Sequence, residues 1–310
     1  MWALAPALAQ PWPAKAITIV VSYPPGGDTD VLARLYADKL SQRLGQQVVI
    51  DNKPGASGTI GNATVAKAAP DGYTLLFAPS TFSIAQHVLK AGAGTAHDVN
   101  RDFTPIVKAG NVALLVIAAS NAGIKDMQQV IADARAGKAS TYGTPGAGSP
   151  MHIAGEMLKK AADVRFTHVP YRGVAPVVTD VMGGHVTIGW VTPGAVGQYL
   201  STGKLLPLAV AEKQRTPLLP NVPTLIELGY RDLYVSAWFA LLGPKGLPSE
   251  VVKTLNTQMN EILKMPDVLS RMEQMGVEPV GGDPAALAKT IADDDERFGR
   301  LVKEFGISVD

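Results

Sequence analysis

The chain of 310 residues contains no cysteine. This absence excludes disulfides, thiolate metal sites and cysteine nucleophiles. No apolar run is long enough to span a bilayer. Neither sign of charge is in excess, because 28 Lys and Arg face 27 Asp and Glu, and no basic run indicates a nucleic-acid partner. An ordinary globular composition remains, and its length predicts two lobes instead of one core.

The first ten residues look like the end of a secretory signal. Ala7-Leu8-Ala9 fits the small-x-small cleavage pattern, and Gln10 would be the first mature residue. The positively charged start of a signal peptide is missing and its apolar part is short, so such a signal would be truncated here. The alternative is an apolar leader without fixed structure. We expect an exported, periplasmic protein and leave residues 1–14 out of the fold.

A turn with two prolines and two glycines, Tyr23–Asp30, is the most informative segment. It follows the apolar run Ile17–Val21 and precedes Val31–Leu44, where apolar residues recur at helical spacing. The glycines let the backbone approach a ligand, and the new helix presents unpaired N–H groups. The turn is therefore a candidate site for a carboxylate or a phosphate. The alternative is a tight turn whose glycines serve packing only.

A second turn of this kind is Thr144–His152, which follows the short strand Ser140–Tyr142. Ser149 is placed to cap a helix that starts with Pro150. Hydroxyl groups and free N–H groups at this helix start form a second candidate anion site. Again the alternative is a glycine-rich turn without a ligand.

Strands and helices alternate in the first third of the chain and again from Ile124, which predicts two mostly parallel sheets flanked by helices. Two long apolar segments, Phe103–Ala119 and Val235–Gly243, are suited to cross between the lobes. We therefore expect an α/β protein with one lobe formed by residues 15–105 and 236–310, and another by residues 106–235. The carboxyl ends of the strands would face an interlobe cleft.

Other chemistries fit the sequence less well. The glycines of Asn52–Gly61 are spaced GxxGxxG, unlike a dinucleotide fingerprint, and no phosphate-binding P-loop motif is present. Ser149 and His152 invite a hydrolase reading, but the GxSxG motif is missing. The five histidines show no metal-ligand spacing. We expect no enzyme activity, no cofactor and no metal. Arg172 could pair with a ligand carboxylate or be a solvated side chain.

Several segments, in order along residues 15–307, resemble the periplasmic receptors of tripartite tricarboxylate transporters, called TctC or Bug proteins. The segments are Tyr23–Asp30, Val48–Ala56, Ala66–Leu75, Tyr142–Ser149, His168–Gly173, Gly203–Leu205 and Pro220–Thr224.

This resemblance implies a two-lobed fold of the type II periplasmic-binding-protein class, with the two crossing strands as hinge. It implies a monomer that closes on a small organic acid and delivers it to membrane subunits of the transporter. In the family, backbone N–H groups and hydroxyls of the glycine-rich turns hold the ligand carboxylates. The positions to which we transfer this role are Tyr23, Pro25, Gly26, Gly27, Thr29, Ser80, Thr81, Thr144, Gly148, Ser149 and Tyr171.

Two departures from the family pattern affect the expected ligand. Asp28 stands where the family often has Gly, Ser or Pro. It would repel a ligand carboxylate unless it turns away or caps the helix, or it could instead bind an amine, amide or hydroxyl. Trp190-Val191-Thr192 replaces an acidic Asp-Asn pair, so we expect Trp190 and Thr192 to form a less polar wall for a ring or an alkyl chain. The alternatives to a transport receptor are an extracellular sensor module for the same ligands and an enzyme that uses the cleft.

Overall fold

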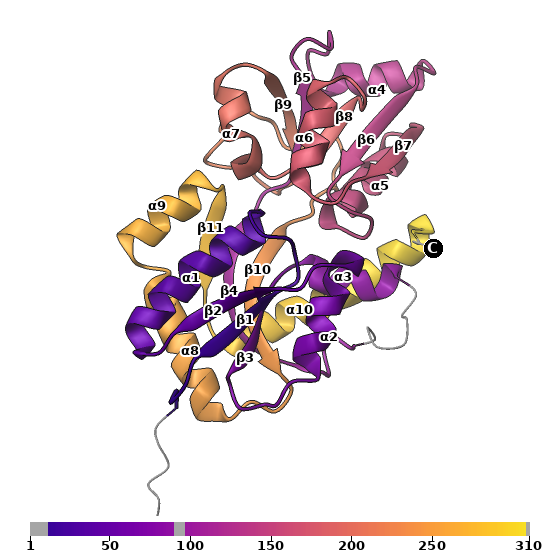
Figure 1. Cartoon of the computed structure of the whole chain (residues 1–310). Helices are drawn as coiled ribbons and strands as arrows, with labels where there is room; N and C mark the ends of the chain where they lie inside the picture. Colours follow the sequence, from indigo (N-terminus) through magenta and orange to yellow (C-terminus); the bar gives the residue numbers. More distant parts are fainter. Residues whose placement is uncertain (1–11, 90–96, 308–310) are drawn as a thin grey trace, which may run out of the picture.

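The computed structural model describes residues 12–89 and 97–307, which form two lobes with one sheet each (Figure 1). The proposed cleavage site near Ala9 and Gln10 lies outside these residues. In spatial order the first sheet contains β11 (Val277–Gly281), β4 (Phe103–Val112), β10 (Ala237–Pro244), β3 (Thr74–Pro79), β1 (Ile17–Val21) and β2 (Val48–Asn52). The second contains β7 (Phe166–Pro170), β6 (Ser140–Thr144), β8 (Ile188–Val191), β5 (Leu115–Ala119) and β9 (Leu205–Val210).

The two-lobed α/β architecture is confirmed, but both sheets are mixed and not mostly parallel. β1 is parallel to β2 and β3, and β6 is parallel to β7 and β8. β10 is antiparallel to β3 and β4, and β5 is antiparallel to β8 and β9. The alternation of strands and helices predicted the parallel pairs. It did not predict the antiparallel ones, because most of them involve strands next to the crossings, which have no βα connection.

The lobes are joined where two chain segments cross side by side. β4 continues into β5 through Ala113 and Leu114, and Leu114 O accepts a hydrogen bond from Ala211 N at 2.9 Å. Val235 N donates to Ala211 O at 2.8 Å, so Ala211, directly after β9, links the outgoing and the returning segments. The expected division after residue 105 falls inside β4, which stays in the first sheet to Val112. We therefore move the proposed boundary from residue 105 to the end of β4 and keep the other domain ranges as a proposal.

Helices cover both faces of each sheet. Successive residues of β1 divide between two cores: Ile17, Ile19 and Val21 face one side and Val20 the other, as the two-residue period of a strand requires. In the first lobe the helices are α1 (Asp28–Leu44), the 3₁₀ turn η1 (Ala56–Gly58), α2 (Thr59–Ala66), α3 (Thr81–Val88), α8 (Ser249–Ile262), α9 (Pro266–Gln274) and α10 (Pro284–Phe305). In the second they are α4 (Met127–Arg135), α5 (Pro150–Ala161), α6 (Val174–Met182) and α7 (Pro193–Ser201).

The long C-terminal helix connects the two lobes at their outer side. The carboxylate of Asp283 caps α10 by accepting from Ala286 N at 2.7 Å, and Pro284 occupies the first helical position. Near the other end of α10, Glu304 pairs with Lys160 of α5. The ends of these two helices lie near each other in Figure 1. In the part of the chain that the structure describes, no helix is both long and apolar enough to cross a membrane.

Candidate functional site

The turns predicted as anion sites lie at the interface between the lobes. Thr192 Oγ1 of the second lobe donates to Asp28 Oδ2 of the first at 2.6 Å. Ser57 Oγ donates across the interface to Ala147 O at 3.2 Å. Gly148 packs so closely on Val88 that a Cβ added to the glycine would lie 3.1 Å from that side chain. Each glycine-rich turn therefore contacts the opposite lobe: the first turn reaches Thr192, and the second turn reaches Ser57 and Val88.

Asp28 and Thr192, which both depart from the family pattern, are direct partners across this interface. Thr192 is 3% exposed and forms the N-terminal boundary of α7. Burial raises the pKa of Asp28, and the hydrogen bond from Thr192 opposes this rise. Thr192 thus contacts the first lobe directly, in addition to its expected place in a cleft wall.

Asp30 holds the first turn in shape. Its carboxylate accepts from Gly26 N at 2.9 Å, from Arg34 Nε at 2.9 Å and from Asn52 Nδ2 at 2.9 Å. Burial favours a higher pKa for Asp30, but the hydrogen bonds from Arg34, Gly26 and Asn52 outweigh it and lower the pKa. The Gly26 N–H, predicted as a ligand donor, is therefore used within the protein. The N–H groups of Asp28, Thr29 and Asp30 start α1 and have no intrahelical acceptor.

A second group of polar side chains lies beside this turn. Tyr23 Oη donates to Ser57 O at 3.2 Å. Burial raises the pKa of Tyr23 to about 12, against a hydrogen bond with Thr81. Ser80 is fully buried at the end of β3, and its Oγ has no hydrogen-bond partner among the described residues. Ser80 therefore offers an unused hydroxyl at the carboxyl end of β3, and the first turn follows the carboxyl end of the parallel strand β1.

Ser57 is a residue of this interface that the sequence reasoning missed. It contacts both Tyr23 and the second lobe, and its φ of 51° lies in the left-handed region, as does the 45° of Ala56. Residues other than glycine rarely adopt this left-handed backbone conformation. Where they do, they are often found at functional sites. The signal in the sequence is the run Gly55-Ala56-Ser57-Gly58, whose two glycines favour a turn that brings the backbone close to a neighbour.

Most polar groups of the second turn, Thr144–His152, form hydrogen bonds with residues of the same lobe. Thr144 Oγ1 lies 2.7 Å from His168 Nε2 and donates to Gly146 O at 3.1 Å. Ser149 Oγ donates to Gly146 O at 2.7 Å and accepts from His152 N at 3.2 Å. Gly148 N donates to His152 Nδ1 at 3.1 Å. Of the three predicted ligand-binding residues in this turn, each already has a partner in the protein.

Two stacked histidines, His152 and His168, form hydrogen bonds with residues of this turn. The rings of His152 and His168 lie 3.8 Å apart at 13°, and Tyr142 stacks on His168 at 4.9 Å. Burial, together with the charge of Lys159, lowers the pKa of His152 to about 4. Burial and the neighbouring His152 lower the pKa of His168 to about 3. Both imidazoles are therefore neutral at pH 7: His152 accepts from the backbone of Gly148, and His168 bonds the side-chain hydroxyl of Thr144.

The remaining predicted residues divide between the interface and its surroundings. Tyr171 Oη donates to Asp180 Oδ2 at 2.6 Å, so this hydroxyl is directed at α6. Trp190 is fully buried, and its Nε1 has no hydrogen-bond partner among the described residues. Arg172 is exposed, as are Pro25, Gly26 and Gly27.

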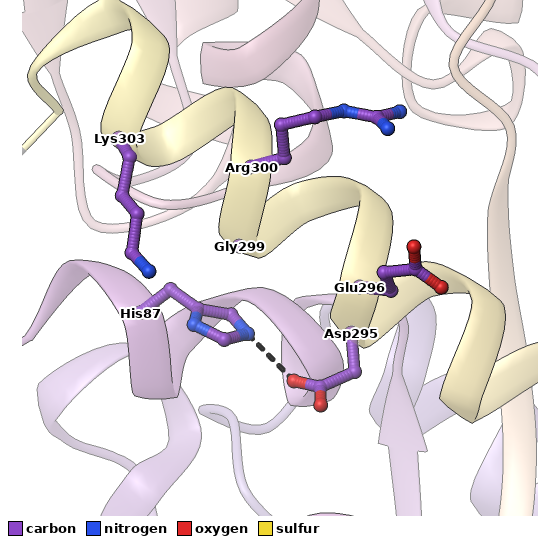
Figure 2. A pocket seen from close by; sticks show the side chains of 6 residues that line it. All are labelled: His87, Asp295, Glu296, Gly299, Arg300 and Lys303. Atoms are coloured by element: carbon purple, nitrogen blue, oxygen red, sulfur yellow. Dashed lines mark hydrogen bonds and ion pairs between the residues drawn. The ribbon is translucent and has the colours of Figure 1, made fainter.

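A shallow hollow of about 440 Å³ lies elsewhere, between α3 and α10 (Figure 2). The carboxylate of Asp295 accepts hydrogen bonds from Asn100 Nδ2 at 2.8 Å and from Gln86 Nε2, and it lies 2.6 Å from His87 Nε2. With these partners Asp295 holds α3 against α10, which indicates a structural role. Within residues 12–89 and 97–307, no group of His, Asp or Glu is arranged to hold a metal ion.

Comparison with known proteins identifies the family. Residues 32–307 match the model of the tripartite tricarboxylate transporter family receptor, TctC. The chain belongs to the TctC family. Among solved structures, the periplasmic binding protein BugD is 30% identical with a TM-score of 0.87, covering 96% of this chain and 100% of its own.

Two further TctC-like structures contain ligands. Rpa4515 of R. palustris, with adipate, is 32% identical with a TM-score of 0.89 and covers 96% of this chain and 100% of its own. MatC (Rpa3494) from Rhodopseudomonas palustris, with bound malate, is 28% identical with a TM-score of 0.85 and covers 94% and 100%. This TctC chain thus has the two-lobed fold of carboxylate-binding periplasmic proteins.

Proposed function

We propose that this protein captures a small organic acid in the cleft between its lobes, closes on it and delivers it to the membrane subunits of a tripartite tricarboxylate transporter. The proposal is carried by one observation: each of the two glycine-rich turns that the residues predict as anion sites contacts the opposite lobe in a TctC-family fold. Two structures similar to this chain contain the dicarboxylates adipate and malate.

The chemistry of the first lobe supports a carboxylate ligand. The N-terminus of α1 presents N–H groups and the positive end of the helix dipole, which favour an anion. The unpartnered hydroxyl of Ser80 is buried at the end of β3, which runs parallel to the β1 strand that leads into the turn before α1. In this proposal Tyr23, Thr29, Ser80 and Thr81 bind from the first lobe, and Thr144, Gly148 and Ser149 complete the site once ligand replaces their internal partners. Pro25, Gly26, Gly27, Tyr171, Trp190 and Thr192 shape its rim and walls.

We expect the protein to act as an exported monomer without catalytic activity. A sensor module that binds the same ligands and signals to another protein is the alternative, and neighbouring genes for transporter subunits would favour transport. The purified protein can be tested in a thermal-shift screen of monocarboxylates, dicarboxylates, aromatic acids and amides. Saturable stabilisation by a carboxylate, without its turnover, is the expected result. If no carboxylate raises the melting temperature, the proposal is wrong.

A further inference from the structure

Two acidic residues in the same turn have opposite surroundings. The charge of Asp30 is balanced by Arg34 and by hydrogen bonds from Gly26 and Asn52. Asp28, two residues earlier, is partly buried, yet its one hydrogen bond among the described residues comes from the neutral hydroxyl of Thr192. In the described part of the chain, no cationic side chain contributes to its ionisation. Asp28 is therefore an acceptor at the interface that has the positive end of the α1 dipole beside it but, among the described residues, no cationic side chain as partner.

Such a carboxylate conflicts with a ligand that carries only carboxylate groups. A partly buried charge without a partner is costly, and a second negative charge nearby adds repulsion. A ligand ammonium group would remove both penalties, because it brings an opposite charge and three hydrogen-bond donors. A ligand hydroxyl would supply a donor and leave the charge unbalanced.

Buried hydrogen-bond donors without a protein partner are present on both lobes. Trp190 Nε1 and Ser80 Oγ are fully buried and lack hydrogen-bond partners among the described residues. Trp190 and Thr192 are two residues apart along an extended chain, so both project to the same side of the strand end. Each lobe therefore holds an unused buried donor, which suits a carboxylate, and the interface between the lobes holds one acceptor without a cationic partner.

We propose that Asp28 determines the ligand class by binding the ammonium group of an amino acid-type carboxylate, while Thr192 holds the second lobe to the same side chain. The inference rests on the proposed function and narrows it. Asp28 thus becomes a specificity-determining residue that links ligand choice to contact between the lobes.

The test is isothermal titration of the purified full chain with matched ligands. The pairs are succinate with aspartate, glutarate with glutamate, and adipate with 2-aminoadipate, and malate serves as the hydroxyl counterpart of aspartate. For at least one pair we expect the amino acid to bind at least about tenfold more tightly than the unsubstituted acid, a difference of about 1.4 kcal/mol. The comparison on the wild-type protein needs no variant.

Three variants assign the preference to Asp28. Asp28→Asn keeps an acceptor for Thr192 and removes the charge. The ratio of the affinity for the amino acid to that for the unsubstituted acid should therefore fall to about one. Thr192→Val removes the hydroxyl with little change of shape, and it should weaken both ligands while the ratio persists. Asp38→Asn, at an exposed site of the same helix, should leave affinity and ratio unchanged.

The outcomes separate this inference from the proposed function. Equal or tighter binding of the unsubstituted acids overturns the inference and leaves the carboxylate receptor standing, as does an unchanged ratio in Asp28→Asn. Malate binding as tightly as aspartate overturns the ammonium assignment in favour of a hydroxyl. If no carboxylate of any kind binds, the proposed function fails together with the inference.

Discussion

Gly194, the second residue of α7, lies against the backbone of Met275 in the other lobe. A Cβ built on this glycine would be 2.3 Å from Met275 O and 2.7 Å from Met275 Cα. The neighbour is backbone, so it cannot rotate away as a flexible side chain could. The helical position itself tolerates alanine, which is normally the better helix former. Gly194→Ala should therefore disturb the approach of the lobes and leave the fold of each lobe intact.

The size of the effect follows from this contact. To accept the methyl group, the distance of 2.3 Å must exceed 3.0 Å, a separation of about 0.7 Å at a place next to Thr192. Overpacking of this kind costs about 1–3 kcal/mol. If the cost falls on the closed form, ligand binding weakens roughly 5- to 150-fold.

Titration calorimetry with the tightest carboxylate of the screen measures this loss, and small-angle scattering reports whether the ligand-bound variant is more open. Gly197→Ala is the matched control, because it lies in the same helix with nothing within 4 Å of the added Cβ. The control should bind like the wild type. Wild-type affinity and an unchanged radius of gyration in Gly194→Ala would refute the reasoning that lobe contact is part of binding.

Three further predictions concern ionisable groups. Burial raises the pKa of Glu212 to about 7, so the free energy of unfolding should fall by up to about 3 kcal/mol as pH rises from 4.5 to 7, and urea denaturation should show that Glu212→Gln lacks this fall. Because the pKa values of His152 and His168 are lowered to about 4 and about 3, NMR titration should find both neutral above pH 5, and stability should decrease as pH drops below 6.5. Asp30→Asn should cost about 1.5–3 kcal/mol in chemical denaturation, because it weakens hydrogen bonds to a buried charge.

Each of these has a contrary result. A pH profile of Glu212→Gln that parallels the wild type would show that Glu212 is not protonated near neutral pH. Histidine resonances that titrate near pH 6.5 would place both rings in contact with water. A stability loss well below 1 kcal/mol in Asp30→Asn would mean that Arg34 and Asn52 can hold the turn without the carboxylate.

The location of both turns could be predicted from the sequence, because each one is a local event. Tyr23–Asp30 and Thr144–Ser149 each combine the end of an apolar strand, glycines and a helix start, which appear within ten residues of each other. The caps also obeyed local rules, since Ser149 accepts from His152 N and Asp283 accepts from Ala286 N as their positions predict.

What the sequence could not supply depends on distant partners. Asp28 and Thr192 are 164 residues apart, and only the folded chain shows that one binds the other. Likewise, the use of the Gly148 N–H by His152 Nδ1 requires the geometry of the turn, which residue types alone do not determine. The antiparallel direction of β10 and β5 followed from the crossing between lobes, where the period of the apolar residues carries no information on direction.

A crystal structure of the protein with the tightest carboxylate of the thermal-shift screen tests the central claim most directly. The account predicts density for the ligand carboxylate between the first turn of α1 and the Thr144–Ser149 turn, with contacts from both lobes. Ligand density confined to another surface, such as the hollow between α3 and α10, would contradict it.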